Sequence, residues 1–357
     1  MRQFFVGSRA SFLAKEKFSY ELSLFMCWHQ ICISLWYNYR SLFNQEVQMH
    51  DNRKMKILSN IMLILAAAIW GSNFIFQKTA ATEIGPFLFM ACRSILGSLT
   101  LIPIILFFRE KSPAEKETRY SRKELLSLIR TSAFCGFINV SGSVMVQFGL
   151  IYTNASKAGF LNAIYIIFVP VLGMIFFKVK SSRFIWLGIL LAVIGLYNLC
   201  LSESLTINPG DLIILASTLC FALHIQLIAK YVHRFNGMHL SCLEFFLASV
   251  FCLFFSLIFE EPSLSQIENC LPSILFAGVL GIGVCYALQV TAQKYTDPTV
   301  AALLMSLESV FGALGGVLVL GETFTVKEFI GVLFIIAAIV IAQIPAKKTE
   351  KEENTPA

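Results

Sequence analysis

Long apolar blocks, separated by short polar connectors, fill most of the chain from residue 57 onward. A helix that crosses the hydrocarbon core of a bilayer, about 30 Å thick, needs roughly 20 apolar residues. The blocks predict ten transmembrane helices, over residues 57–77, 86–108, 131–151, 157–177, 183–201, 211–229, 239–259, 272–291, 298–320 and 327–344. The pattern therefore predicts an all-α membrane protein that crosses the lipid bilayer ten times.

The two ends of the chain do not continue this pattern. The apolar stretch from Ser23 to Trp36 is short and contains His29 and Gln30, and it lacks the small-residue cleavage site of a signal peptide. We interpret residues 1–54 as an N-terminal extension that is either an upstream translation artefact or a peripheral segment. Residues 345–357 are interpreted as a polar cytoplasmic tail.

Composition supports a membrane protein and narrows the function classes. Hydrophobic residues make up 57% of the chain, charged residues 14%, and the mean hydropathy is +0.72. Soluble globular chains are roughly 45–50% apolar and about 25% charged. The apolar blocks leave no room for a large soluble catalytic domain. The net charge of +6 resides in the connectors, so nucleic acid is not an expected partner.

The basic residues indicate how the helices are oriented. They concentrate in alternate connectors, including 109–130 and 178–183, whereas 202–210 has no Lys or Arg and 260–271 has three acids and no basic residue. Cytoplasmic connectors of membrane proteins are enriched in Lys and Arg. With ten crossings, the alternation predicts that both termini are cytoplasmic.

An internal repeat relates the two halves of the chain. Tyr152-Thr153 precedes the fourth block and Tyr295-Thr296 the ninth, and the same gapless register aligns two further glycine pairs, Gly173 with Gly316 and Gly188 with Gly331. Residues 55–201 and 202–344 are thus predicted to be two five-helix repeats. Because each repeat has an odd number of helices, the second repeat crosses the membrane in the opposite sense to the first. Inverted repeats are typical of secondary transporters, whose substrate site lies near the bilayer midplane between the halves.

Three sequence segments resemble one family. Residues 298–310 (PTVAALLMSLESV) followed by Leu320-Gly321-Glu322, residues 155–165 (ASKAGFLNAIY), and residues 68–74 (AIWGSNF) are similar to segments of EamA-type transporters of the drug/metabolite transporter superfamily. The family often has proline where this chain has Ser309, which leaves the helix break at that point open.

The resemblance covers roughly residues 57–344. It implies ten helices and movement of amino acids, nucleotide-sugar-like metabolites or drugs, often outward. It also implies a plasma-membrane location, which we take to be the bacterial inner membrane. The expected partners are a small-molecule substrate and the bilayer, with protons as a candidate coupling ion and a homodimer as a candidate assembly.

Polar side chains inside the blocks are the candidate substrate-binding residues, because polar groups at membrane depth tend to face the bundle interior or a cavity. Glu308 lies about halfway along its block, where it would hold a substrate amine, a proton, or a structural hydrogen bond. The register of the repeat pairs Glu308 with Tyr165. The full candidate set is Glu308, Tyr165, Trp70, Asn73, Asn162, His224, Gln147, Tyr286 and Gln289. Apart from Glu308, each is also open to interpretation as a packing or interhelical hydrogen-bonding residue.

Four further side chains have competing interpretations. Arg93 would neutralise Glu308 or bind an anionic substrate, or else form an interhelical salt bridge or extend its guanidinium toward the nearer membrane interface, and the last two interpretations are favoured. His224 would relay protons or simply pack within the bundle. Glu244 lies near the cytoplasmic end of its block and is expected at the surface. Glu322 would act as a gate, with Lys327 as its partner, or as an exposed interfacial acid. Gly312 and Gly316 form a GxxxG pair that predicts close helix packing.

The sequence therefore favours a secondary transporter, with export by alternating access as the leading hypothesis. A translocase of lipid-linked substrates is the main alternative. An intramembrane enzyme is less favoured, because the chain has no HExxH motif and none of its aspartates, Asp51, Asp211 and Asp297, lies in the middle of a block. The ten cysteines show no paired metal-ligand spacing, so neither a metal nor another cofactor is predicted.

Overall fold

A computed structural model describes residues 52–109, 120–153, 155–178, 181–200, 208–320 and 325–344, and these residues form helices and connectors without a strand. Seven of the described helices are long and apolar enough to cross a membrane, and two shorter apolar helices, Arg183–Leu199 and Pro298–Leu314, accompany them. The predicted all-helical, multi-pass architecture is confirmed, while the count of ten crossings stays a prediction. Our interpretations of residues 1–51, of residues 345–357 and of Glu322 lie outside the described residues.

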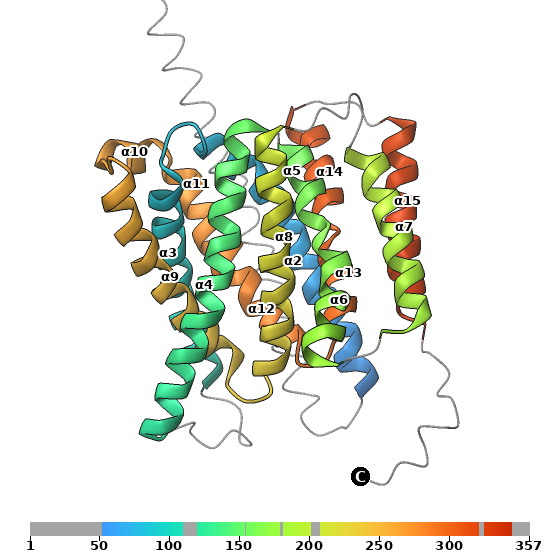
Figure 1. Cartoon of the computed structure of the whole chain (residues 1–357), viewed down its shortest axis with the longest axis horizontal. Helices are drawn as coiled ribbons and strands as arrows, with labels where there is room; N and C mark the ends of the chain where they lie inside the picture. Colours follow the sequence, from blue (N-terminus) through green and yellow to red (C-terminus); the bar gives the residue numbers. More distant parts are fainter. Residues whose placement is uncertain are drawn as a thin grey trace, which may run out of the picture.

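The helices follow the order of the predicted blocks (Figure 1). The first half contains α2 (Asn52–Ala80), α3 (Pro86–Arg109), α4 (Arg122–Tyr152), α5 (Ala155–Ala163), α6 (Tyr165–Phe177) and α7 (Arg183–Cys200). The second half contains α8 (Pro209–Tyr231), α9 (Gly237–Phe259), α10 (Leu264–Asn269), α11 (Leu271–Leu275), the π-helix η1 (Phe276–Val284), α12 (Cys285–Ala292), α13 (Pro298–Met305), α14 (Glu308–Leu320) and α15 (Val326–Ala342).

Local sequence signals explain several helix ends. The first turn of α4 begins at Arg122 rather than at residue 131, because Ser121 and Glu124 form a capping box before the apolar block starts. Equivalent boxes begin α8 and α15, formed by Asn208 with Asp211 and by Thr325 with Glu328. These polar starts add turns that hydropathy alone does not detect.

The N-terminus of α3 is capped by a different helix. The carboxylate of Glu260, at the end of α9, accepts hydrogen bonds from the backbone amides of Phe87 and Leu88, both at 2.8 Å. A carboxylate at this position satisfies two amides that lack a partner within the helix, and it also interacts favourably with the helix dipole. The contact therefore ties α9 to α3, its neighbour across the two halves.

The packing of the helices is symmetric between the halves. Helix α7 packs along α15, at one edge of the bundle in Figure 1, and α3 packs along α9. Each of these pairs joins a helix to its counterpart. Helix α4 packs on α8, and its counterpart α12 packs on α2 in the same way. Helices α5 and α6 contact α8, and their counterparts α13 and α14 contact α2. Exchanging the halves leaves this pattern unchanged, as a twofold axis requires.

Two helices break at positions that the predicted repeat places in register. At each break the regular i−4 hydrogen bond is replaced by an i−3 hydrogen bond. The amide of Ile164 donates to Leu161 O, and the amide of Leu307 donates to Leu304 O. Both bonds are 3.3 Å long. Tyr165 and Glu308 therefore begin α6 and α14 at equivalent positions. The helix breaks before Glu308 without a proline, which settles the question that Ser309 left open.

Glycines allow the symmetric pairs to approach closely. A Cβ added at Gly195 of α7 would lie 2.7 Å from Gly331 O, and one added at Gly331 would lie 2.6 Å from Gly195 O. Gly312 of α14 similarly faces the backbone of Gly71 in α2, which confirms close packing at one of the two predicted glycines. Backbone-to-backbone contact at Gly195 and Gly331 leaves no space for a Cβ there, whereas a Cβ added at Gly312 would lie 3.4 Å from Gly71 O, an ordinary van der Waals contact.

We predict that Gly195→Ala lowers the melting temperature of the purified protein in detergent, because its new methyl group meets backbone that cannot move aside. The expected cost is about 1–3 kcal/mol, the range for overpacked cores. Gly159→Ala is the matched control. Its Cβ would meet its nearest atoms at 3.9 Å, so this variant should melt at or above the wild-type temperature. Equal melting of the two variants would contradict the proposed close contact.

Candidate functional site

A cavity of about 90 Å³ lies inside the bundle, between helices of both halves. Its lining residues are Trp70, Asn73, Phe74, Gln77, Arg93, Ser143, Val146, Asn162, Tyr165, Phe221, His224, Ile225, Tyr286, Gln289, Met305 and Glu308. Pockets for drug-sized ligands measure roughly 300–1,000 Å³. In this conformation the cavity therefore suits a small solute rather than a large drug.

All but one of the nine candidate substrate-binding residues line this cavity. Gln147 is the exception: it is fully buried, and its side-chain amide donates to the backbone oxygen of Gln77 at 3.1 Å. The sequence thus predicted which residues gather in one place, although their role in substrate binding stays a prediction.

Glu308 carries a negative charge, when ionised, on one wall of the cavity. Its Oε1 accepts a hydrogen bond of 3.0 Å from Nδ2 of Asn162 in α5, and both residues are buried. Tyr165, the counterpart of Glu308 in the first half, lines the same cavity and lies within electrostatic range of that carboxyl group. The two helix breaks therefore bring their first residues to one site.

Arg93 brings a positive charge to the same cavity. Its Nη1 donates to Oε1 of Gln77 at 2.9 Å, and its guanidinium carbon lies 5.9 Å from the ring centroid of Phe89. Among the described residues it forms no ion pair, and its buried Nε has no protein partner. Of the two favoured interpretations, the interhelical salt bridge is therefore wrong among the described residues, because the groups around Arg93 are an amide and an aromatic ring. The burial of the side chain at the cavity argues against its extension to the membrane interface.

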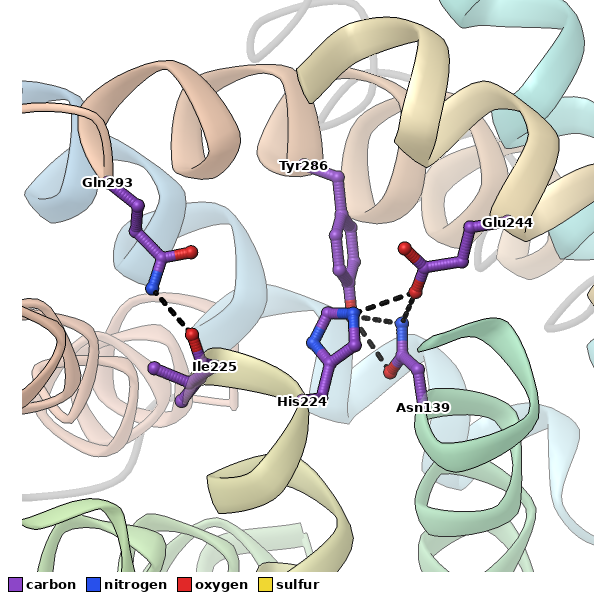
Figure 2. Close-up of polar contacts among 6 residues, drawn as sticks. All are labelled: Asn139, His224, Ile225, Glu244, Tyr286 and Gln293. Atoms are coloured by element: carbon purple, nitrogen blue, oxygen red, sulfur yellow. Dashed lines mark hydrogen bonds and ion pairs between the residues drawn. The ribbon is translucent and has the colours of Figure 1, made fainter. Parts of the chain in front are cut away.

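A second polar cluster lies beside the cavity, formed by four residues that point toward one another from α4, α8, α9 and α12 (Figure 2). Nε2 of His224 lies 2.7 Å from Oε1 of Glu244, and that oxygen also accepts from Nδ2 of Asn139 at 2.9 Å. The hydroxyl of Tyr286 lies 3.1 Å from Nδ2 and 3.2 Å from Oδ1 of Asn139. Each of the four side chains is buried.

The expected surface position of Glu244 is wrong, since this residue is fully buried. Helix α9 approaches α4 closely at Gly136, where an added Cβ would lie 2.8 Å from the backbone oxygen of Glu244. Its position two turns from the start of α9 suggested exposure. The better signal was its apolar surroundings in the sequence, with Leu243 before it and Phe245 after it.

Trp70 connects the π-helix to the cavity. Its Nε1 donates to the backbone oxygen of Gly281 in η1 at 2.7 Å, and its ring packs edge-on against Tyr286 with centroids 5.4 Å apart. A π-helix departs from the regular i−4 ladder and often occurs at functional sites. The irregular backbone of η1 thus fixes the orientation of an aromatic wall.

Several polar atoms of the lining residues have no protein partner. They are Asn73 Oδ1, Arg93 Nε, Asn162 Oδ1 and Gln289 Oε1, and all are buried. Buried polar atoms in proteins are almost always hydrogen-bonded. These four atoms at the cavity wall are therefore candidates to be satisfied by water or by a polar ligand.

Metal ligation finds no support in the described part of the chain, which contains no group of three or more His, Cys, Asp or Glu residues able to hold an ion. The arrangement offers an acidic and a basic side chain, Glu308 and Arg93, together with several hydrogen-bonding groups and an aromatic wall. Such a site is suited to recognising a small polar solute.

These features define a multi-pass helical membrane protein with a polar internal cavity between two related halves. The sequence profile of the EamA-like transporter family matches residues 57–201 and again residues 208–343. The chain therefore belongs to the EamA-like transporter family, as the resemblance implied.

The chain is also similar to proteins described as uncharacterized transporters. One from Archaeoglobus fulgidus is 28% identical over 293 residues, covering 81% of this chain and 87% of the relative. YoaV of Bacillus subtilis is 23% identical, covering 78% of this chain and 94% of the relative. A solved crystal structure with 14% identity has the same fold, with a TM-score of 0.65 over 81% of this chain and 99% of that one. Family and relatives point to a transporter rather than to an enzyme.

We predict that Arg93→Met leaves the melting temperature in detergent unchanged or raises it, because the substitution removes a buried charge that has no ionic partner. Lys157→Met is the comparison. Lys157 pairs with the buried Asp211 at 2.5 Å, so its loss should cost about 2 kcal/mol, between the values for exposed and fully buried pairs. An equal drop for both variants would show that Arg93 is a structural charge.

Proposed function

We propose that the protein is a secondary transporter that moves small zwitterionic solutes across the plasma membrane by alternating access. The observation that carries the proposal is the cavity between the halves, with its unsatisfied polar atoms and its two opposite charges. The cavity is the substrate site, and the direction of transport is outward.

The charges of Glu308 and Arg93 support a zwitterionic substrate. Each side chain is buried, faces the same cavity and lacks an ion pair among the described residues. Burying an uncompensated charge is costly at membrane depth. A solute with an ammonium group at Glu308 and a carboxylate at Arg93 compensates both charges at once. Amino acids have this chemistry, and they are among the substrates that the family resemblance implies.

The paired helix breaks support alternating access. In transporters built from inverted repeats, discontinuous helices form the substrate site, and one unit rocks against the other around it. Here the breaks at Ile164 and Leu307 are equivalent in the two halves, and each is followed by a residue that lines the cavity. The proposal includes ten crossings, with both termini in the cytoplasm of a bacterial cell.

We predict that cells overproducing the wild-type protein enrich one or more amino acids in the medium relative to cells with empty vector. Glu308→Gln should reduce the initial efflux rate about 10- to 100-fold, the equivalent of losing one hydrogen bond to a charged group. The measurement is quantitative mass spectrometry of the medium, with the amount of protein in the membrane determined for each strain.

A second variant separates the two ends of the substrate. Arg93→Gln should reduce efflux of amino acids but not of an amine that lacks the carboxylate. Gln226→Met, which removes a buried hydrogen bond to Val169 O outside the cavity, is the control and should transport at the wild-type rate. Equal efflux by the wild type and by Glu308→Gln would contradict a substrate role for Glu308.

A further inference from the structure

We propose that the His224–Glu244 pair is the proton-carrying site of the transport cycle, separate from the substrate carboxylate Glu308. A proton gradient would then drive transport through this pair, with Asn139 and Tyr286 positioning it. The inference rests on the proposed transport function and assigns its coupling ion to particular residues.

The pair reaches from the cavity into the protein interior. His224 and Tyr286 line the cavity, whereas Glu244 and Asn139 are not among its lining residues and lie beside His224, on the helices α9 and α4 that pack together (Figure 2). The exposed fraction of His224 is 2% and that of Glu244 is 0%. A proton from the cavity therefore reaches Glu244 through the imidazole ring, which has a nitrogen on each side.

The two side chains offer three charge states without breaking their contact. With a neutral imidazole and an ionised carboxylate the pair carries one negative charge, and the hydrogen bond uses the proton on Nε2. One added proton makes the pair neutral overall, and a second makes it positive. Glu244 Oε2 is buried without a protein partner, so it can receive a proton that no existing hydrogen bond blocks.

The groups that face the pair set its electrostatic surroundings. Arg93 on α3 interacts with Tyr286 on α12, and the thiol of Cys135 on α4 interacts with Glu244. The same cavity is also lined by Tyr165 on α6 and Glu308 on α14. None of these groups forms an ion pair with Glu244, whose recorded ionic partner is His224. Its protonation therefore changes the net charge at the cavity wall.

That change of charge couples the proton to the substrate. Glu308 and His224 belong to different helices but face one cavity of about 90 Å³. Charges inside a protein interact much more strongly than charges in water. A positive pair repels an ammonium group at Glu308, and a negative pair attracts it. Proton and substrate therefore exclude each other, which is the requirement for exchanging an inward proton for an outward solute.

The test uses purified full-length protein in liposomes, with a radiolabelled mixture of the common L-amino acids as the probe. One assay measures exchange of label at equal pH on both sides. The other measures accumulation against a gradient when the pH differs and the membrane potential is held at zero. The wild type should accumulate label up to about 10-fold for each unit of pH difference if one proton is exchanged per solute.

Glu244→Gln, a change outside the cavity lining, should keep exchange within about threefold of the wild type while losing accumulation, because only accumulation requires the proton. His224→Gln should lose accumulation as well. Glu308→Gln should lose both, and the α8 control Gln226→Met should keep both. Accumulation by Glu244→Gln equal to that of the wild type would overturn the assignment, as would a proportional loss of both activities in Glu244→Gln. Absence of exchange by the wild type would instead contradict the proposed function, and this inference with it.

A measurement on the wild type alone covers the case in which the pair variants do not fold. Addition of the amino-acid mixture to the purified protein in weakly buffered detergent solution should release up to one proton per molecule, detected with a pH-sensitive dye. The release is measured at a series of pH values between about 5 and 8. No release anywhere in that range would overturn the proposal.

Discussion

The bilayer provides no hydrogen-bonding partners, and this single constraint organises the structure. Every backbone amide and carbonyl inside the hydrocarbon region must find its partner within the protein, which favours helices almost everywhere. The exceptions in this bundle are few and lie together. The breaks at Ile164 and Leu307 adjoin residues of the central cavity, and Trp70 and Tyr286 connect the π-helix η1 to it. Irregular backbone is thus confined to the place where protein or water can satisfy it.

The same constraint explains why the site was largely visible in the sequence. Inside an apolar block, a residue such as Asn73, Asn162 or Gln289 is conspicuous, because a lipid-facing polar group would be costly. Such residues face the interior, and the interior of a single small bundle converges on one cavity. The gapless register of the internal repeat also correctly related Tyr165 to Glu308, since both begin a half-helix at the equivalent position.

What the sequence did not predict depends on contacts between helices. Depth within a block suggested an exposed Glu244, but the close approach of α4 at Gly136 buries that carboxyl group. The salt bridge expected of Arg93 required an acid opposite it, and nothing in a linear sequence says that Gln77 lies there instead. The π-helix had no recognisable signal, because its residues are as apolar as those of the regular helices around it.

Helices α7 and α15 pack against each other outside the central cavity. They meet through the backbones of Gly195 and Gly331, and neither helix contributes a residue to the cavity lining. The helices that line the cavity are therefore not the ones that make this contact. Under the proposed function, substitutions in the lining alter the selectivity while this edge of the bundle stays unchanged. On the same basis, members of such a family can differ in the solute that they transport while keeping the same packing of these two helices.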